Sequence, residues 1–547
     1  MNNRMEFFKN RSESKRKKIK EAVKKAGCVF VLLHVLSLPW ACDKKPADNR
    51  AGTVEPPDKI VVTLYPSKEQ QTIHSFGASD CWTAKFVGNW PDEQKKNRIA
   101  DLLFSMDTLR DGSPEGIGLS LWRFNIGGGS FEQGTASNIK DEWRREECFI
   151  NADGSYNWKK QKGQQWFLQA ARKRGVAYTL GFSLTPPVFM TQNGKAYNAS
   201  GGTRMNIREG MMGAYAAFLA KVTAHFKFDF LSPVNEPQWK WGKADGAGQE
   251  GTQALNTEIA ALVKAIALKM KNVPAKIVVG EAGQWDYVFG KNEKGCGDQA
   301  RRFFTPGAAT YIGGLPQVAG IISAHSYFTT CPDAAAVSIR QQVRSVAQQL
   351  APLQVWQTEF GILGNICNQY RGAPRNTGID YGLYVAKVIH YDLTVANATS
   401  WQWWLAMSPY NYSDALVYIN TPSGKIDASA CKTDGIVSDS KQLWALGNFA
   451  RFIRPGMKRI TVTVSGKAAA GNVLVSAYKE KDTKKTVVVL INPEDREQSV
   501  QLKGIEHQPL GVYTTDRIQN LKHSVVQPNE MRLPPKSVVT VTGMCRQ

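Results

Sequence analysis

The sequence predicts an α/β protein, a (β/α)8 TIM barrel with a side β-sandwich built from the C-terminal region plus an N-terminal strand. Short β-branched or apolar runs alternate with amphipathic helical segments, and eight such runs recur over about 370 residues. This alternation of eight strands with helices is typical of the barrel. After about residue 440 the pattern changes to short strands separated by turn residues, which predicts the sandwich. A doubly wound open sheet is the alternative, but the glycine cluster at 125–130 lacks dinucleotide-binding spacing.

The chain begins with a segment typical of an export signal. Residues 1–41 hold ten Lys or Arg against three Glu, and the apolar run at 28–38 is short for a transmembrane span. The next residue, Cys42, follows an alanine as in a lipoprotein cleavage site, and 42–57 has the polar composition of a flexible tether. We therefore predict a signal peptide over 1–41, lipidation of Cys42, and a cell-envelope (periplasmic or outer-membrane) lipoprotein. Simple secretion and an uncleaved anchor are the alternatives.

The elements that follow the tether can be placed in order along the chain. One strand within 58–71 precedes the barrel and is assigned to the sandwich, the barrel spans 72–440, and 441–547 forms the rest of the sandwich. The eight barrel strands are expected at 72–79, 118–127, 177–184, 228–234, 276–282, 320–328, 353–360 and 398–405. Good helical segments between them lie at 164–174, 208–226, 256–270, 339–350 and 381–395.

Two glutamates fall at the tips of predicted barrel strands. Glu236 follows the fourth strand in the stretch SPVNEPQW, and Glu359 ends the seventh in VWQTEFG. Because the carboxyl ends of the strands meet at one face of a barrel, we expect these side chains to share one bowl. Two converging carboxylates are the apparatus of glycoside hydrolysis, in which one donates a proton to the leaving oxygen and the other attacks the sugar carbon.

Other polar and aromatic side chains at strand ends are candidate partners of this pair. Arg123 is placed to hold a carboxylate ionised through an ion pair, Asn235 is suited to a sugar hydroxyl, and aromatic faces stack on sugar rings. We predict that the substrate-binding residues are Asp80, Trp82, Arg123, Asn235, Trp239, His325, Tyr327, Trp401 and Trp404. The competing interpretations are an ordinary structural ion pair for Arg123 and a satisfied core histidine for His325.

Five further residues are given other roles. Glu281 ends the fifth strand and is expected to support the reacting carboxylates. Trp122, Trp356 and Trp403 are expected to pack, while Trp241 is balanced between sugar contact and loop packing.

Net charge and cysteine spacing indicate which kinds of ligand the protein does not bind. The net charge is +22, of which +7 lies in residues 1–41, and the remaining +15 is spread without a basic block. No helix-turn-helix, RNP or zinc-finger signature is present, so no nucleic-acid partner is predicted. The nine cysteines show no CxxC or Cys/His ligand spacing, so we predict no metal and no cofactor. Buried free thiols are expected for several of them, and a monomer is the expected state.

The ordered motifs resemble glycoside hydrolase family 30 from about residue 58 to the C-terminus. They are SFGASDCW (75–82), WRFNIGGGSF (122–131), SLTPPVFM (183–190), SPVNEPQW (232–239), SAHSYF (323–328), VWQTEFG (355–361), SWQWWLAMSP (400–409) and LGNFARFIRPGMKRI (446–460). The resemblance implies a retaining mechanism with Glu236 as acid/base and Glu359 as nucleophile. It also implies that the N-terminal strand joins the sandwich.

Within the family the chain looks most similar to the bacterial branch of endo-β-1,6-galactanases. It departs from the family pattern at Leu184 and Phe189, where tryptophans are usual, and at Asp80 and Cys81 in the first loop. The predicted function is a retaining β-glycoside hydrolase of a β-linked polysaccharide or oligosaccharide, with β-1,6-galactan favoured. Glucuronoxylan and β-1,6-glucan are the alternative substrates. A non-catalytic carbohydrate-binding protein of the same fold is the rival from another class.

Overall fold

The computed structural model describes residues 59–291, 294–350, 353–466, 473–506, 508–528 and 531–546. The predicted signal peptide, the lipidation site Cys42 and the tether lie outside these described residues. Within them, no helix combines the length and the apolar character that a passage through a bilayer requires.

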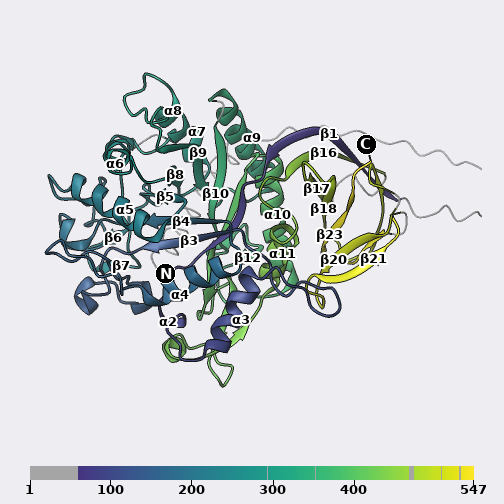
Figure 1. The fold of residues 1–547 in the computed structure, drawn as a ribbon, viewed down its shortest axis with the longest axis horizontal. Helices are drawn as coiled ribbons and strands as arrows, with labels where there is room; N and C mark the ends of the chain where they lie inside the picture. The colour runs from purple at the N-terminus through teal and green to yellow at the C-terminus, as the bar shows by residue number, and fades with distance from the viewer. Residues whose placement is uncertain are drawn as a thin grey trace, which may run out of the picture. The chain divides into compact units, whose positions relative to one another are not determined.

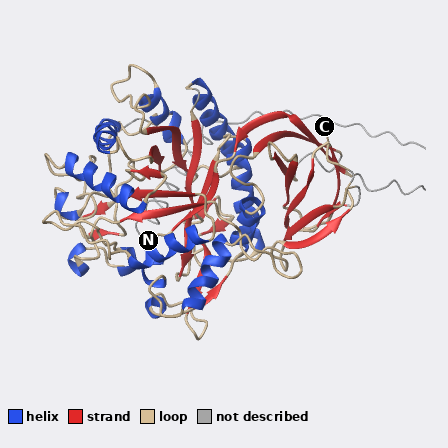
Figure 2. Cartoon of the chain, in the orientation of Figure 1, coloured by secondary structure: helices blue, strands red, loops and turns tan. Residues whose placement is uncertain are grey.

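Eight parallel strands form a closed barrel (Figures 1 and 2). They are β2 (Ser75–Ser79), β3 (Leu121–Ile126), β4 (Tyr178–Ser183), β5 (Phe230–Ser232), β8 (Lys276–Ala282), β9 (Val318–His325), β10 (Gln354–Phe360) and β13 (Ser400–Ser408). Pairing of β10 with β13 closes the circle. Both faces of these strands are buried, as expected for parallel strands covered by helices. The predicted TIM barrel is confirmed, and each strand overlaps its predicted run.

Helices cover the outside of the barrel (Figure 2). They are α2 (Ala84–Val87), α3 (Glu93–Phe104), α4 (Lys162–Lys173), α5 (Met212–Phe226), α6 (Asn256–Lys269), α7 (Asp286–Phe289), α8 (Gln299–Phe304), α9 (Asp333–Gln349) and α10 (Ile379–Thr394). Asp92 caps α3 by accepting hydrogen bonds from the backbone N–H groups of Gln94 and Lys95. Fully buried Trp122 and Trp403 belong to the same hydrophobic core as these helices.

Aromatic rings fill the lower end of the barrel, opposite the tips of the strands. The ring of His74 stacks on Tyr178 at 4.1 Å and lies 4.6 Å from Trp356, which in turn meets Phe230 at 4.9 Å. Burial lowers the pKa of His74 to about 4, so this ring packs as a neutral side chain. Aromatic packing therefore closes the barrel interior at this end, and a functional site is expected at the opposite end, where the strand tips lie.

Two strands that the sequence did not predict extend the barrel sheet. β14 (Ala415–Asn420) pairs parallel with β13, and β15 (Ile436–Ser438) pairs antiparallel with β14. The loops after β5 and β10 each contain a short hairpin. These hairpins pair β6 (Gly242–Lys243) with β7 (Gly246–Ala247) and β11 (Asn365–Ile366) with β12 (Tyr370–Arg371).

The second part is a nine-stranded sheet in the order β21-β20-β23-β18-β17-β16-β1-β19-β22. Its strands are β1 (Ile60–Thr72), β16 (Lys458–Ser465), β17 (Leu474–Lys479), β18 (Lys485–Asn492), β19 (Gln498–Lys503), β20 (Leu510–Thr515), β21 (Lys522–Val526), β22 (Met531–Leu533) and β23 (Ser537–Met544). β1 pairs antiparallel with β16 and parallel with β19. The N-terminal strand thus belongs to this side domain, as the sequence predicted.

Alternating residues give this sheet two buried faces. One face, with Val488 and Val541, forms the core of the side domain itself. The other, with Tyr478 and Val489, joins the core of the barrel through α10 and α11 (Lys441–Ala450). Because successive strand residues point to opposite faces, one sheet can serve both cores at once.

One disulfide bond, Cys331–Cys367, joins the segments that follow β9 and β10. It therefore ties together the loops beyond the two strands that carry His325 and Glu359. Among the other cysteines of the described part, Cys81, Cys148, Cys431 and Cys545 are buried free thiols, and Cys296 is buried as well, in line with the expectation of several buried thiols.

Candidate active site

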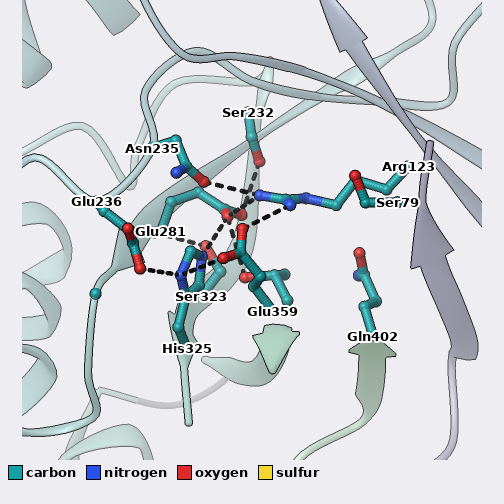
Figure 3. Close-up of polar contacts among 12 residues, drawn as sticks. Ser79, Arg123, Ser232, Asn235, Glu236, Glu281, Ser323, His325, Glu359 and Gln402 are labelled. Carbon is teal, nitrogen blue, oxygen red and sulfur yellow. Dashed lines mark hydrogen bonds and ion pairs between the residues drawn. The ribbon is translucent and has the colours of Figure 1, made fainter. Parts of the chain in front are cut away.

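The tips of five barrel strands bring a set of charged and polar side chains into contact (Figure 3). Arg123 comes from β3, Asn235 and Glu236 follow β5, Glu281 ends β8, His325 ends β9 and Glu359 lies on β10. All six are at least 98% buried. Glu236 and Glu359 meet here although they are 123 positions apart, because their strands end at the same face of the barrel.

A turn after β5 aims Glu236 into this bowl. Its backbone adopts a left-handed conformation with φ of 44°, which is rare for a residue with a side chain. A hydrogen bond to β8 stabilises the turn, because the Glu236 N–H donates to the Glu281 carbonyl oxygen at 2.8 Å. Pro237 then follows and has no N–H to satisfy. The Asn-Glu-Pro stretch is therefore a turn that places a carboxyl group at the strand tip.

Glu359 is held by two donors, one from β3 across the barrel and one from the segment that follows β9. Its Oε2 accepts from Arg123 Nη1 at 2.9 Å, and its Oε1 accepts from the Tyr327 hydroxyl at 2.9 Å. The Arg123 guanidinium is in turn stacked over the Phe182 ring at 3.7 Å. A cation and a hydroxyl that both donate to one carboxylate fix its direction and favour its ionised form.

Glu281 lies behind the pair and accepts hydrogen bonds from four side chains. Arg123 Nη2 and Ser232 Oγ donate at 2.9 Å, and Thr358 Oγ1 and His325 Nε2 donate at 3.1 Å. Burial opposes its charge, but the charge of Arg123 and the hydrogen bond from His325 outweigh burial and lower the pKa of Glu281 to about 2. Glu281 is therefore an ionised carboxylate throughout the neutral range.

His325 bridges the carboxylates with both ring nitrogens. Nδ1 lies 3.0 Å from Glu236 Oε1 and 3.7 Å from Glu359 Oε1, while Nε2 faces Glu281. Burial disfavours the imidazolium, yet the charge of Glu359 and the hydrogen bonds to Glu236 and Glu281 raise the pKa of His325 to about 9. The ring is a cation at neutral pH, so it acts as a charged partner of the acids.

Glu236, His325 and Glu359 are close enough together to be considered as ligands of a metal ion. Among the described residues, ligand atoms of Glu236, His325 and Glu359 lie within 4.8 Å of one another. An imidazolium has no lone pair to offer a metal, and Glu359 already pairs with Arg123. The donor chemistry therefore does not favour an ion here, and the prediction of no metal stays a prediction.

The charges of this cluster predict how protein stability depends on pH. The folded-state pKa of His325 is raised from 6.5 to about 9, so its contribution to stability is full below about pH 6.5 and is lost as pH rises through 9. We expect the melting temperature of the wild type to fall between pH 7 and 10. We expect a His325→Gln variant to show a shallower fall, as checked by thermal melts across that range. Parallel curves for both proteins would contradict the assigned charge.

Three further predicted residues, Asp80, Trp82 and Trp404, lie just after β2 and on its neighbour β13. Asp80 Oδ1 accepts from the Asn125 N–H at 2.9 Å, and Oδ2 is buried with no hydrogen-bond partner among the described residues. Burial, opposed by the Asn125 hydrogen bond and the charge of Arg123, raises the pKa of Asp80 to about 8. Trp82 and Trp404 meet edge to face at 5.2 Å. Trp82 and Trp404 are thus in contact, and Asp80 lies two positions before Trp82 in the chain.

The placement of Trp401 corrects the prediction that it binds substrate. Its indole N–H donates to Asp392 of α10 at 2.8 Å, and the side chain is fully buried in the core between barrel and helices. Alternate residues of a strand face opposite sides, and Trp401 shares the outer face of β13 with Trp403. Trp401 is a packing residue. Trp241 also packs, in a cluster with Ile139 and Tyr197.

Trp239 forms an aromatic cluster that the sequence only partly revealed. Its ring meets Tyr287 at 5.9 Å and Phe328 at 5.6 Å, and Phe328 is 41% exposed. β9 ends at His325, so strand alternation does not decide where Phe328 points, and its backbone is left-handed with a φ of 61°. No sequence signal marks such a backbone conformation. Ser232 and Thr358, which bond Glu281, were likewise not predicted as site residues.

Comparisons with known proteins agree with this architecture. Residues 58–418 match the family model described as O-Glycosyl hydrolase family 30. The crystal structure of a conserved exported protein from Bacteroides fragilis is 32% identical, with a TM-score of 0.82 over 88% of this chain and 100% of that chain.

Two more distant structures share the fold. The catalytic domain of a family 30 xylanase C from Talaromyces cellulolyticus is 22% identical, with a TM-score of 0.64 over 88% of this chain and 100% of that one. An endo-β-1,6-glucanase is 16% identical, with a TM-score of 0.61 over 89% and 94% of the two chains. The family match covers most of this chain and includes β5 and β10 with both glutamates. The resemblance read from the motifs is thus confirmed, and the chain belongs to glycoside hydrolase family 30.

Proposed function

We propose that this protein is a retaining β-glycoside hydrolase that cleaves a β-linked polysaccharide, with β-1,6-linked galactan as the favoured substrate. The observation that carries the proposal is the approach of Glu236 and Glu359, whose nearest oxygens lie within 4.8 Å of each other. Retaining enzymes hold their carboxyl groups about 5–5.5 Å apart, whereas inverting enzymes need about 6.5–9.5 Å to admit a water molecule. The short distance supports retention.

The contacts give each glutamate a distinct role. Glu359, held ionised by Arg123 and Tyr327, attacks the anomeric carbon. Glu236, which hydrogen-bonds His325, gives its proton to the leaving oxygen and then takes one from the water that cleaves the intermediate.

Neighbouring side chains are suited to position the sugar. Asn235 Oδ1 accepts from Arg123 Nη2 at 2.9 Å, which turns its NH2 group toward the bowl as a donor for the hydroxyl beside the reacting carbon. Asp80, neutral below about pH 8, offers its second oxygen to another hydroxyl. Trp82 and Trp404 offer aromatic edges and faces to the ring.

The aromatic cluster of Trp239, Tyr287 and Phe328 is assigned to the leaving-group side of the cleavage point. Trp239 belongs to the same turn as Glu236, to which its N–H donates at 3.1 Å, and the proton donor faces the leaving group. Exposed Phe328 then supplies a platform for sugar units beyond the cleaved bond.

A substitution at this platform separates chain binding from chemistry. We expect Phe328→Ala to raise KM for an oligosaccharide roughly fivefold, equivalent to the loss of about 1 kcal/mol of stacking. Cleavage of an aryl monoglycoside should be unchanged because it places no sugar on the platform. Steady-state kinetics with both substrates measures this, with Ile518→Ala, 90% exposed on the side domain, as the control. Equal losses on both substrates would move Phe328 from the platform to the reacting sugar.

A substrate screen tests the proposed function as a whole. Purified protein is incubated with β-1,6-galactan, β-1,6-glucan and glucuronoxylan, and proton NMR follows the newly formed reducing ends. We expect hydrolysis of the galactan, with the β-anomer appearing first. An initial α-anomer would establish inversion. Binding without hydrolysis of any of the three would favour a carbohydrate-binding protein of the same fold.

The location in the cell is part of the same proposal. The basic and apolar segment over 1–41 followed by Cys42 supports export and attachment through a lipid at that cysteine. Mass spectrometry of the mature N-terminus from a bacterial host tests this directly. A mature chain that begins elsewhere would favour simple secretion.

A further inference from the structure

We propose that Glu281 is a positioning residue of the reaction, a third and permanently charged carboxylate that keeps Arg123 and His325 cationic while one negative charge passes between Glu359 and Glu236. This inference rests on the proposed retaining mechanism. It concerns a residue that does not touch the sugar and acts only through its two cationic neighbours.

The contacts of Glu281 exclude a direct role. Its side chain is fully buried, Oε1 accepts from Ser232, and Oε2 accepts from Arg123, His325 and Thr358 (Figure 3). Because the side chain is fully buried and both oxygens accept from protein donors, Glu281 does not face the sugar. Four donors around one buried carboxylate are the means by which a protein keeps a charge out of water in its ionised form.

The charges of the buried cluster balance only when Glu281 is included. With Glu236 protonated, Glu281 and Glu359 are the anions, and Arg123 and His325 are the cations. The cluster is then neutral, which a buried site favours because an unbalanced charge is costly away from water. Without the charge of Glu281 the cluster would carry an excess positive charge, and His325 is the group able to relieve it by losing a proton.

The two half-reactions keep this balance. In the first, a bond forms between Glu359 and the anomeric carbon, the glycosidic bond breaks, and its electron pair goes to the leaving oxygen, which takes the proton of Glu236. Glu359 is now a neutral ester and Glu236 an anion. In the second, the oxygen of water bonds to that carbon, its proton returns to Glu236, and the ester electrons return to Glu359. One negative charge thus alternates between two carboxyl groups.

His325 is placed to follow that charge without moving. Nδ1 lies 3.0 Å from Glu236 Oε1 and 3.7 Å from Glu359 Oε1, so its proton can serve whichever acid is ionised. The Glu281 carboxylate, at 3.1 Å from Nε2, keeps that nitrogen protonated and fixes the ring.

Arg123 is fixed in the same way, with Nη2 on Glu281 and Nη1 on Glu359. Three other titratable groups act on this cluster, and one of them, the Cys81 thiol, stays neutral because burial raises its pKa well above the usual value. The Tyr327 hydroxyl donates to Glu359, and Asp80 feels the charge of Arg123. Asp80 is neutral below about pH 8 and so leaves the balance unchanged at neutral pH. Glu281 is therefore the constant anion of the site.

The test compares Glu281→Gln with Ser232→Ala and Thr358→Val. The first removes the charge and keeps the shape, while each control removes one hydrogen bond and keeps the charge. Nitrogen-15 NMR of labelled histidine follows His325 from pH 5 to 10, and the signal is assigned among the seven histidines by its loss in His325→Gln. We expect an imidazolium up to about pH 9 in the wild type and controls, and in Glu281→Gln a midpoint at least about one pH unit lower, a tenfold change.

Kinetics on a cleaved substrate provides the second readout. We expect Glu281→Gln to lower kcat about 100-fold through misplaced reacting groups with little change in KM, and Glu281→Asp to restore the histidine charge and part of kcat. An unchanged His325 titration in folded Glu281→Gln overturns the proposal, as does an equal kcat loss in the controls. If Glu281→Gln does not fold, a neutral His325 at pH 7 in the wild type overturns it. Absence of hydrolysis by the wild type would refute the proposed function and leave the titration as the test of Glu281.

Discussion

Glu359→Gln is expected to lower kcat by at least about 10⁴-fold, the scale of losing a covalent nucleophile, while leaving polysaccharide binding close to the wild-type level. Arg123 and Tyr327 donate to the two oxygens of the wild-type carboxylate at 2.9 Å each; the amide keeps the shape, accepts from Arg123 through its one oxygen, and turns its NH2 group to the Tyr327 hydroxyl as a donor. It cannot form a bond to the anomeric carbon at a useful rate. Stopped assays of product release and isothermal titration with an oligosaccharide measure the two effects separately.

The matched control is Glu497→Gln, the same chemical change at an exposed position paired with Arg532 on the side domain. It should retain full activity. Wild-type turnover by Glu359→Gln would show that another group attacks the sugar. A loss of binding that matches the loss of turnover would show instead that the substitution collapses the bowl.

The second large effect is expected from Glu236→Gln, which removes the proton donor. General acid–base groups contribute about 10²–10⁴-fold, and the full loss should appear on a polysaccharide, whose leaving oxygen needs a proton. An aryl glycoside with an acidic phenol needs no such help, so its first step should be spared and the covalent intermediate should accumulate. Burst kinetics measures this.

A small anionic nucleophile provides the complementary measurement for Glu236. Azide needs no general base, so it should restore turnover of the aryl glycoside in Glu236→Gln and give a β-glycosyl azide. Azide should have no such effect on Glu359→Gln. Equal rate losses on both substrates, or no response to azide, would contradict the acid/base assignment.

The strand-tip positions of the site were predictable because they depend only on the order of elements. β5 is merely three residues long, yet its place as fourth barrel strand was enough to locate Asn235 and Glu236. The same rule located Arg123, Glu281 and His325. Closure of the barrel then makes neighbours of residues far apart in sequence, and no side-chain detail is required.

Features that depend on local backbone conformation were not predictable in this way. Trp401 was expected at the sugar because Trp401 and Trp404 were placed on one strand end, but residues three apart on a strand face opposite sides, so Trp401 packs with Trp403 in the outer core while Trp404 faces inward. Phe328 enters the site through a left-handed residue. Nothing in residue type distinguishes these cases. The central place of Glu281 on β8 likewise depends on contacts that form only when four other strands, β3, β5, β9 and β10, are assembled around it.

The position of β1 has a consequence for folding during synthesis on the ribosome. On β1, Tyr65 contacts Thr463 of β16, 398 residues later in the chain. At about 5–20 residues per second a ribosome needs about 20–80 s to make that interval, and until then β1 has neither of its neighbours. An orphan strand of this kind is a template for intermolecular pairing. The side domain is thus completed last. Truncated chains that end before β16 are expected to aggregate.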